Sequence, residues 1–139
     1  MTDRKIELLQ SVPLFASQGE RGIDEISRLV RVIDLPAGRR LTTEGEPGTE
    51  FFVIASGAVR IERQGRYLRT LQAGDFLGEI ALIDGGPRTA TATTESDAQL
   101  LVIAQSDFGV LLERFPEIQS AVVGALAERI RRLEPEAGF

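Results

Sequence analysis

The hydrophobic and polar positions divide the chain into a helical start, a β-rich middle and a helical end. Near the start, four apolar residues recur at the three- and four-residue spacing of a single helical face. They are Ile23, Ile26, Leu29 and Val30. Ser17 is followed three positions later by Glu20, which is a capping-box pattern and predicts that the helix begins there.

From about residue 31 the apolar positions follow a shorter period. The segment 51–55, FFVIA, is apolar at every position, whereas 58–63, AVRIER, alternates between apolar and polar residues. Glycine and proline turn signals recur about every eight to twelve residues, as in a sandwich or barrel. Pro47 and Gly48 suit the central positions of a type II turn. We therefore expect an antiparallel β sandwich or barrel with a last strand over 98–103.

Two further helices are predicted after the strands. Ser106 is the expected N-cap of the first helix. Its apolar face consists of Phe108, Leu111, Leu112 and Phe115. Pro116 suits the first turn of the second helix, where the N–H that proline lacks has no partner inside the helix. The apolar stripe of this helix consists of Ile118, Val122, Ala125, Leu126, Ile130 and Leu133.

Length and composition exclude several classes of chemistry. A chain of 139 residues is expected to form one domain, spanning 1–139. The chain contains neither cysteine nor histidine, which removes disulfides, thiol nucleophiles and imidazole or thiolate metal sites. The usual hydrolase and metalloenzyme sites are therefore not expected.

The charge and hydropathy of the chain limit the classes of partner that it is expected to bind. The net charge of −5 argues against a nucleic-acid surface, because binding to phosphate backbones needs a basic face. The start of the chain lacks the apolar core of a signal peptide. The longest apolar run, 121–127, is too short to cross a bilayer. We expect a cytoplasmic protein with no membrane partner.

The segment 78–91, GEIALIDGGPRTAT, carries one acid and one base among small and apolar residues. Gly78 allows a close approach of the backbone, and 79–83 is long enough for one short helical turn. The first N–H groups of such a turn have no intrahelical partners and attract anions. A glycine-glycine-proline turn could fold Arg88 back over them, and an arginine fork beside free amides suits a phosphate.

The residues that follow Arg88 alternate between threonine and alanine. If they form a strand, Arg88, Ala90 and Ala92 share one face, on which the alanines leave space. Glu79 makes sense beside a phosphate if the ligand also offers a hydroxyl donor, as a sugar phosphate does. The alternative is a partly exposed ion pair between Glu79 and Arg88, contributing about 0–1 kcal/mol to stability.

Residues 74–92, GDFLGEIALIDGGPRTATA, resemble the phosphate-binding cassette of cyclic nucleotide-binding domains. Such domains occur in catabolite activator proteins, in the regulatory subunits of cyclic-nucleotide-dependent kinases and in gated channels. The positions that match the family pattern are Gly74, Asp75, Gly78, Glu79, Ala81, Leu82, Pro87, Arg88 and Ala90. The resemblance extends over almost the entire chain.

The resemblance implies a mainly β fold, an eight-stranded antiparallel jelly-roll barrel flanked by helices. N-terminal helices would occupy 1–30 and the barrel 31–104, with the phosphate-binding cassette at 74–91. The hinge and lid helices would occupy 105–134.

The resemblance also implies a role for particular residues. Arg88 would hold the cyclic phosphate, and Glu79 would bind the ribose 2′-hydroxyl. The rest of the ligand cradle would consist of Gly78, Ile80, Ala81, Thr89 and Ala90. Arg129 and Leu133 would fall where the activator family covers the purine with its C-terminal helix.

The expected function is that of a stand-alone regulatory sensor and not of an enzyme. It would bind cyclic AMP in preference to cyclic GMP, need no other cofactor, and signal through a rearrangement of its C-terminal helix. We expect no DNA binding by this chain alone, because the sequence ends six residues after Leu133, before any helix-turn-helix.

Two alternative functional hypotheses are compatible with the same sequence. The chain could be a nucleotide-free interaction scaffold of the same fold, but a pure scaffold has no reason to keep both Glu79 and Arg88. It could also be an enzyme on a similar barrel, but metal-dependent cupins rely on histidines, which this chain lacks. A homodimer and an unidentified protein effector both stay open as partners.

Overall fold

The computed structural model describes residues 3–78 and 86–136, and the side chains within these ranges as far as Glu128. Its N-terminal part is helical and consists of α1 (Arg4–Ser11), α2 (Pro13–Ala16) and α3 (Gly19–Ser27). Ile23 and Ile26 of α3 and the following Val30 are buried, and Leu29 packs against them, which confirms the predicted helical face.

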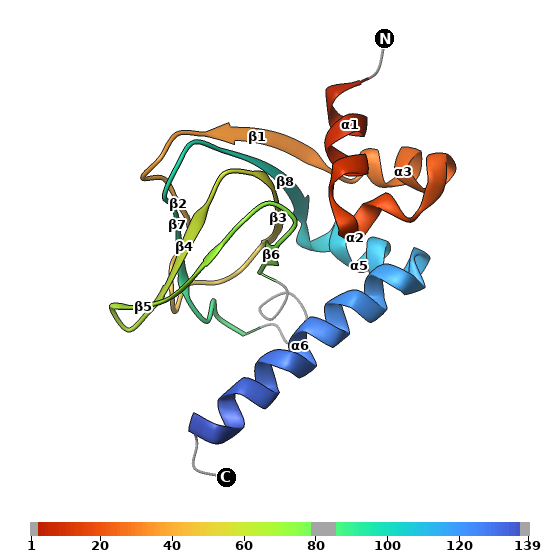
Figure 1. Cartoon of the computed structure of the whole chain (residues 1–139). Helices are drawn as coiled ribbons and strands as arrows, with labels where there is room; N and C mark the ends of the chain where they lie inside the picture. Colours follow the sequence, from red (N-terminus) through yellow and green to blue (C-terminus); the bar gives the residue numbers. More distant parts are fainter. Residues whose placement is uncertain (1–2, 79–85, 137–139) are drawn as a thin grey trace.

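Eight strands lie between residues 31 and 104 in the described part of the chain. They are β1 (Arg31–Leu35), β2 (Arg40–Thr42), β3 (Glu50–Ser56), β4 (Val59–Arg63), β5 (Arg66–Leu71), β6 (Phe76–Leu77), β7 (Thr91–Thr94) and β8 (Ala98–Ala104). One sheet has the order β1-β8-β3-β6 and the other the order β2-β7-β4-β5, with antiparallel neighbours throughout. Figure 1 shows the two sheets wrapped around each other. This jelly-roll arrangement confirms the predicted fold class.

Two helices follow β8 directly. Helix α5 (Gln105–Arg114) is separated from α6 (Pro116–Glu136) by Phe115 alone. Proline therefore opens α6, as predicted. Figure 1 shows α6 as one long rod that starts beside α2 and α5.

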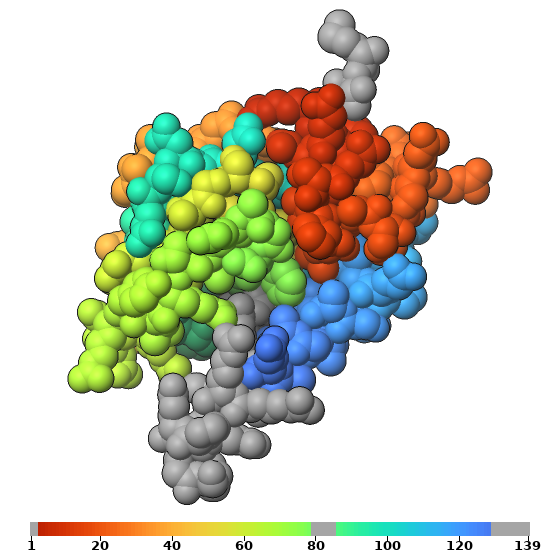
Figure 2. All heavy atoms as spheres, viewed as in Figure 1, coloured from red at the N-terminus to blue at the C-terminus, as the bar shows by residue number. Residues whose placement is uncertain are grey.

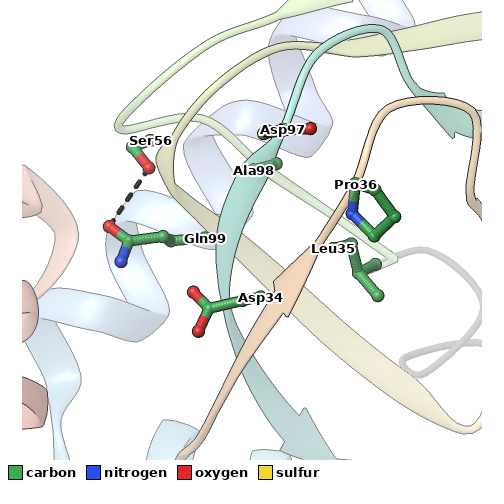
Figure 3. Close-up of a pocket in the computed structure, with 7 residues that line it drawn as sticks. All are labelled: Asp34, Leu35, Pro36, Ser56, Asp97, Ala98 and Gln99. Atoms are coloured by element: carbon green, nitrogen blue, oxygen red, sulfur yellow. Dashed lines mark hydrogen bonds between the residues drawn. The ribbon is translucent and has the colours of Figure 1, made fainter.

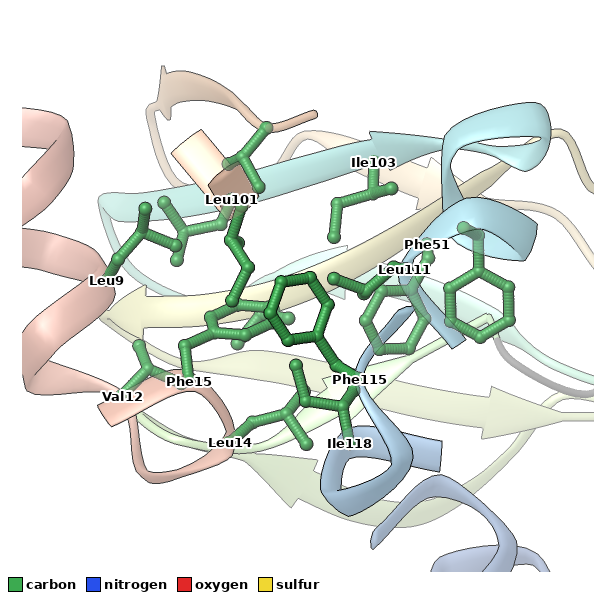
Figure 4. Packing of buried hydrophobic residues seen from close by; sticks show 14 of the residues in the cluster. Leu9, Val12, Leu14, Phe15, Phe51, Leu101, Ile103, Leu111, Phe115 and Ile118 are labelled. Carbon is green, nitrogen blue, oxygen red and sulfur yellow. The ribbon is translucent and has the colours of Figure 1, made fainter. Parts of the chain in front are cut away.

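The buried side chains form two clusters, which share the central strands β3 and β8. Phe52 and Ile54 of β3 belong to the cluster between the two sheets. Phe51 and Val53 point to the opposite face, where they pack with Phe15 and Phe108 under the helices (Figure 4). The consecutive apolar residues at 51–55 are thus explained, because this strand is covered on both faces.

The outermost part of the second sheet is exposed. The hairpin formed by β4 and β5 lies at an edge of the molecule away from the N-terminal helices, where Figure 2 shows it in yellow-green. Tyr67 and Leu68 of this hairpin are among the exposed large apolar residues. On β4, Val59 and Ile61 are buried while Arg60 and Glu62 are half-buried, which confirms the predicted alternation.

Both predicted N-caps are wrong. Ser17 is the C-cap of α2, and Gln18 occupies the N-cap position of α3. The Ser17 hydroxyl lies 3.5 Å from a carboxylate oxygen of Glu117. Ser106 lies inside α5, because β8 runs into this helix without a loop and Ala104 occupies the cap position. The first N–H of α5, on Gln105, donates instead to the carbonyl of Thr49 at 2.9 Å.

Candidate functional site

The backbone around Arg88 is fixed by the loop between β2 and β3. The N–H of Arg88 donates to the carbonyl of Glu46 at 2.8 Å, and its carbonyl accepts from the N–H of Gly45 at 2.9 Å. Pro87 and Pro47 form an isolated antiparallel bridge beside these bonds. The chain therefore enters β7 from a rigid two-stranded contact.

The loop that makes this contact turns at a different glycine from the predicted one. Gly45 has a φ of +88°, and the N–H of Glu46 donates to the carbonyl of Thr43 at 3.1 Å. Gly48 has no positive φ, so the type II turn predicted at Pro47 and Gly48 is wrong. Pro47 instead takes part in the bridge to Pro87, which requires extended backbone at that position.

The guanidinium of Arg88 is held by backbone carbonyls. The Arg88 side chain is buried, with 8% of the residue exposed. Its Nη2 donates to the carbonyl of Glu50 at 2.6 Å, and its Nη1 donates to the carbonyl of Gly78 at 3.3 Å. Its Cζ lies 5.8 Å from the centre of the Phe52 ring. Two of the contacts that orient this guanidinium are therefore with main-chain carbonyls at the end of the first sheet.

Gly78 is required by the position of Arg88. Its φ is +100°, which side chains rarely adopt. A Cβ built on Gly78 would lie 2.5 Å from Nη1 of Arg88 and 2.8 Å from the carbonyl oxygen of Glu50. The close approach predicted from this glycine is therefore an approach to the guanidinium itself.

Thr89 and Ala90 follow the arginine on the way into β7. Thr89 is exposed, and Ala90 is half-buried against the cluster between the sheets. The carbonyl of Ala90 accepts a hydrogen bond of 3.0 Å from the hydroxyl of Thr42. β7 begins only at Thr91, so Arg88 and Ala90 precede the strand and the condition under which they would share a face with Ala92 is not met. The carbonyl and N–H of Arg88 are already bound to the β2–β3 loop, which keeps it out of the ladder.

Several predicted site residues lie outside the described residues. They are Glu79, Ile80 and Ala81, together with the short helical turn predicted over 79–83. Arg129 and Leu133 fall within the bounds of α6, but their side chains lie beyond those described. The structure therefore brings together Gly78, Arg88, Thr89 and Ala90 of the predicted set.

Glu50 was not expected in the site. It contributes its main-chain carbonyl, and because every residue has one, the amino-acid type at position 50 gives no indication of this role. The available signal was indirect, since Glu50 begins a strand covered on both faces and such a strand places its first residue at the end of the barrel.

The described part of the chain holds a hollow of about 350 Å³ away from Arg88. It lies at the ends of β1 and β3 and the start of β8, and it is lined by Asp34, Leu35, Pro36, Ser56, Asp97, Ala98 and Gln99 (Figure 3). Arg88 meets the first residue of β3, whereas Ser56 is the last. At about 3.3 Å per residue, the two regions lie at opposite ends of this strand.

Two ionisable groups elsewhere in the described barrel have shifted pKa values. A hydrogen bond from Arg4 lowers the pKa of the Asp34 carboxyl. A hydrogen bond to Glu62 raises the pKa of Arg60. Within residues 3–78 and 86–136, no group of three or more His, Cys, Asp or Glu residues could hold a metal ion. Over the same ranges, no helix combines the length and the hydropathy needed to cross a membrane.

A family model described as the cyclic nucleotide-binding domain matches residues 32–115. The chain belongs to the cyclic nucleotide-binding domain family. The match runs from β1 through α5 to Phe115 and includes Arg88, which confirms the resemblance seen at 74–92. Cyclic nucleotide-binding domains are typically regulatory modules without catalytic activity.

Relatives of this cyclic nucleotide-binding domain occur in larger proteins. A cyclic nucleotide-gated potassium channel of Rhizobium etli is 36% identical over 126 residues, which cover 91% of this chain and 35% of the channel. A CRP-like cAMP-activated global transcriptional regulator of Mycobacterium tuberculosis is 30% identical over 131 residues, covering 91% of this chain and 58% of the regulator. The crystal structure of the Thermus thermophilus catabolite activator protein matches with a TM-score of 0.80 and 30% identity, over 90% of this chain and 61% of that chain. The chain thus spans less than two thirds of each of these proteins.

Proposed function

We propose that this domain is a regulatory sensor that binds a cyclic nucleotide, with Arg88 holding the cyclic phosphate. The observation that carries the proposal is the buried guanidinium of Arg88, oriented by the carbonyls of Glu50 and Gly78. A planar guanidinium can bind a phosphate through two parallel hydrogen bonds, which fixes both the position and the direction of the ligand.

The burial of the arginine strengthens its attraction for an anion. Charges interact more strongly where water is excluded, and a phosphate would recover part of the desolvation cost of the guanidinium. The two carbonyls accept hydrogen bonds from Nη1 and Nη2, and these contacts direct the plane of the guanidinium. A rigid cation prepared in this way loses little entropy when the ligand binds.

The rest of the proposed cradle surrounds this arginine in the sequence. Glu79 would accept a hydrogen bond from the ribose 2′-hydroxyl, and the amides near Ala81, Thr89 and Ala90 would bind the phosphate. Gly78 and Ile80 complete the set. The small side chain of Ala90, half-buried against the inter-sheet cluster, supports a ligand lying close to the backbone here.

The proposed ligand is cyclic AMP in preference to cyclic GMP. The similarity to the cAMP-activated regulator of Mycobacterium tuberculosis supports this choice. The domain would have no catalytic role. Its signal would be a rearrangement of α6, on which Arg129 and Leu133 would close over the purine and present a changed surface to a partner.

Isothermal titration of the whole chain with cyclic AMP, cyclic GMP and linear 5′-AMP tests this function. We expect saturable binding of the cyclic nucleotides, tighter for cyclic AMP, and much weaker binding of 5′-AMP, because a site shaped for the compact cyclic phosphate does not fit the open monoester. If neither cyclic nucleotide binds, the proposal is wrong and the domain is a nucleotide-free scaffold of the same fold.

A further inference from the structure

Glu50 binds two arginines at once, through different groups. Its main-chain carbonyl accepts the 2.6 Å hydrogen bond from Nη2 of Arg88. Its side-chain Oε2 pairs with Nη2 of Arg31 at 2.7 Å. The residue that orients the proposed phosphate-binding arginine is therefore itself held by a second arginine from another strand.

The three residues lie at the same end of the first sheet. Arg31 is the first residue of β1 and Glu50 the first of β3, and β8 runs between these strands. Arg31 lies opposite Val102 of β8, and Val102 lies opposite Phe52 of β3. Residues directly opposite in an antiparallel ladder point to the same face.

That face is the one on which Arg88 lies. Val102 and Phe52 belong to the cluster between the sheets, and Glu50 is two positions from Phe52, so it shares this face. The guanidinium of Arg88 lies over the Phe52 ring. The ion pair between Arg31 and Glu50 therefore crosses β8 on the ligand side of the sheet, over a strand separation of about 10 Å.

The ion pair between Arg31 and Glu50 matters because Glu50 lies at the terminal pair of the ladder between β3 and β8. Glu50 pairs with Ala104, the final residue of β8, and no ladder pair of β3 precedes it in the described structure, although the Gln105 N–H donates to the carbonyl of the preceding Thr49 at 2.9 Å. Strand ends open more readily than strand centres. A side-chain contact that ties the first residue of β3 to β1 would reduce this opening and keep the Glu50 carbonyl directed at Arg88.

We propose that Arg31 is a positioning residue of the phosphate site, acting through its ion pair with Glu50 to hold the carbonyl that orients Arg88. This inference rests on the proposed function, since it assigns Arg31 to the same site. The side chains of Arg31 and Glu50 are 65% and 33% exposed, so the pair itself adds little to the free energy of unfolding. Its effect belongs to ligand affinity.

A double-mutant cycle separates positioning from a simple effect of charge. If Arg31 acted only by attracting the phosphate, Glu50→Ala would remove a negative charge and raise affinity. If the pair positions Arg88, Arg31→Ala and Glu50→Ala each lower cyclic nucleotide affinity by about threefold to tenfold. The double variant then loses no more than either single variant, because both remove the same contact. Arg31→Lys recovers part of the affinity.

Arg4→Ala is the matched control. It removes another exposed ion pair to β1, between Arg4 and Asp34, that has no contact with Glu50. We expect it to leave nucleotide affinity unchanged and to lower the melting temperature about as much as Arg31→Ala does. Unchanged affinity in Arg31→Ala, tighter binding in Glu50→Ala, or additive losses in the double variant would each overturn the inference.

A second measurement needs no nucleotide. The Nε–H signal of Arg88 in a ¹⁵N NMR spectrum, assigned by its disappearance in Arg88→Lys, reports the environment of the guanidinium. We expect this signal to shift or broaden in Arg31→Ala and in Glu50→Ala, but not in Arg4→Ala. If the unmutated chain binds no nucleotide, the proposed function is wrong. Separately, an unchanged Arg88 signal in Arg31→Ala would show that Arg31 does not position Arg88.

Discussion

The carbonyl oxygen of Glu50 accepts a 2.6 Å hydrogen bond from Nη2 of Arg88, although 38 positions separate the two residues in the sequence. Glu50 begins β3 of the first sheet, and Arg88 leads into β7 of the second. The arginine is therefore oriented by a contact between the two sheets. Any change that separates the sheets at this end of the barrel also alters the site.

Arg88→Leu is expected to abolish measurable binding of cyclic nucleotide. Removing one partner of a desolvated charged pair costs about 2–5 kcal/mol of binding free energy. Titration calorimetry measures the loss, and thermal unfolding shows whether the variant remains folded. Arg114→Leu, which removes an exposed arginine paired with Glu25, is the control and keeps its affinity. Near-native binding by Arg88→Leu would contradict the assignment.

Gly78→Ala is expected to displace the Arg88 guanidinium and weaken binding. The new Cβ would clash with Nη1 of Arg88 and with the Glu50 carbonyl, in addition to a backbone strain of about 1–3 kcal/mol. Gly65→Ala is a matched control, because Gly65 also has a positive φ, of +75°, but open space where the Cβ would lie. Both variants lose stability, and only Gly78→Ala loses affinity. Equal affinity in the two would show that Gly78 serves the turn alone.

Glu79→Ala is expected to weaken binding by about 1.5–3 kcal/mol, the value of a hydrogen bond to a charged group. The unmutated chain should reject a 2′-deoxy cyclic nucleotide, whereas the variant should bind the ribose and deoxyribose forms about equally. Competition titrations with the two ligands measure this ratio. A ratio that the substitution leaves unchanged would remove Glu79 from the ribose site.

Thr89 provides a test of base preference. Its side chain is exposed next to Arg88, where a hydroxyl could bind the guanine amino group or only the phosphate. With cyclic AMP as the preferred ligand, we expect Thr89→Ala to weaken both nucleotides to a similar degree. Cyclic GMP binding tenfold tighter than cyclic AMP, with Thr89→Ala weakening cyclic GMP alone, would reverse the preference.

Ligand binding is expected to slow amide hydrogen exchange over residues 116–133. Closure of α6 over a purine would bury apolar surface and shift the helix toward one position. Burying one leucine side chain contributes about 1.5–3 kcal/mol, which favours a partial shift. Exchange that does not respond to nucleotide, with a mass that depends on concentration, would instead assign the apolar stripe of α6 to a constitutive dimer.

The helical faces and the central strand were predictable because burial leaves a direct trace in the sequence. Ile23 and Ile26 follow the helical period, and the run at 51–55 is apolar on both faces of β3. Helix ends were less predictable, because the residue at the cap position depends on where the preceding strand or helix ends. Ser106 lost the cap position because β8 enters α5 directly.

In the site, residue type and spacing predicted Arg88 and Gly78 but not what holds them. The described partners of Arg88 include the carbonyls of Glu46, Glu50 and Gly78, and every residue offers such an acceptor. Which carbonyl is in reach depends on strand register, and register follows from pairing between distant segments. The sequence therefore indicated the cation and the close approach, while the orientation of the cation required the fold.

The two-sided burial of β3 and β8 has a consequence for any shortened form of the chain. A fragment beginning at residue 31 would keep every strand described here, and α5 would still cover Phe51, but the part of the β3–β8 face that packs against α1 and α2 would lose its cover. An uncovered apolar sheet of this kind invites self-association. The N-terminal helices thus shield apolar surface from solvent, and we expect a chain without them to aggregate, so that its ligand binding could not be measured.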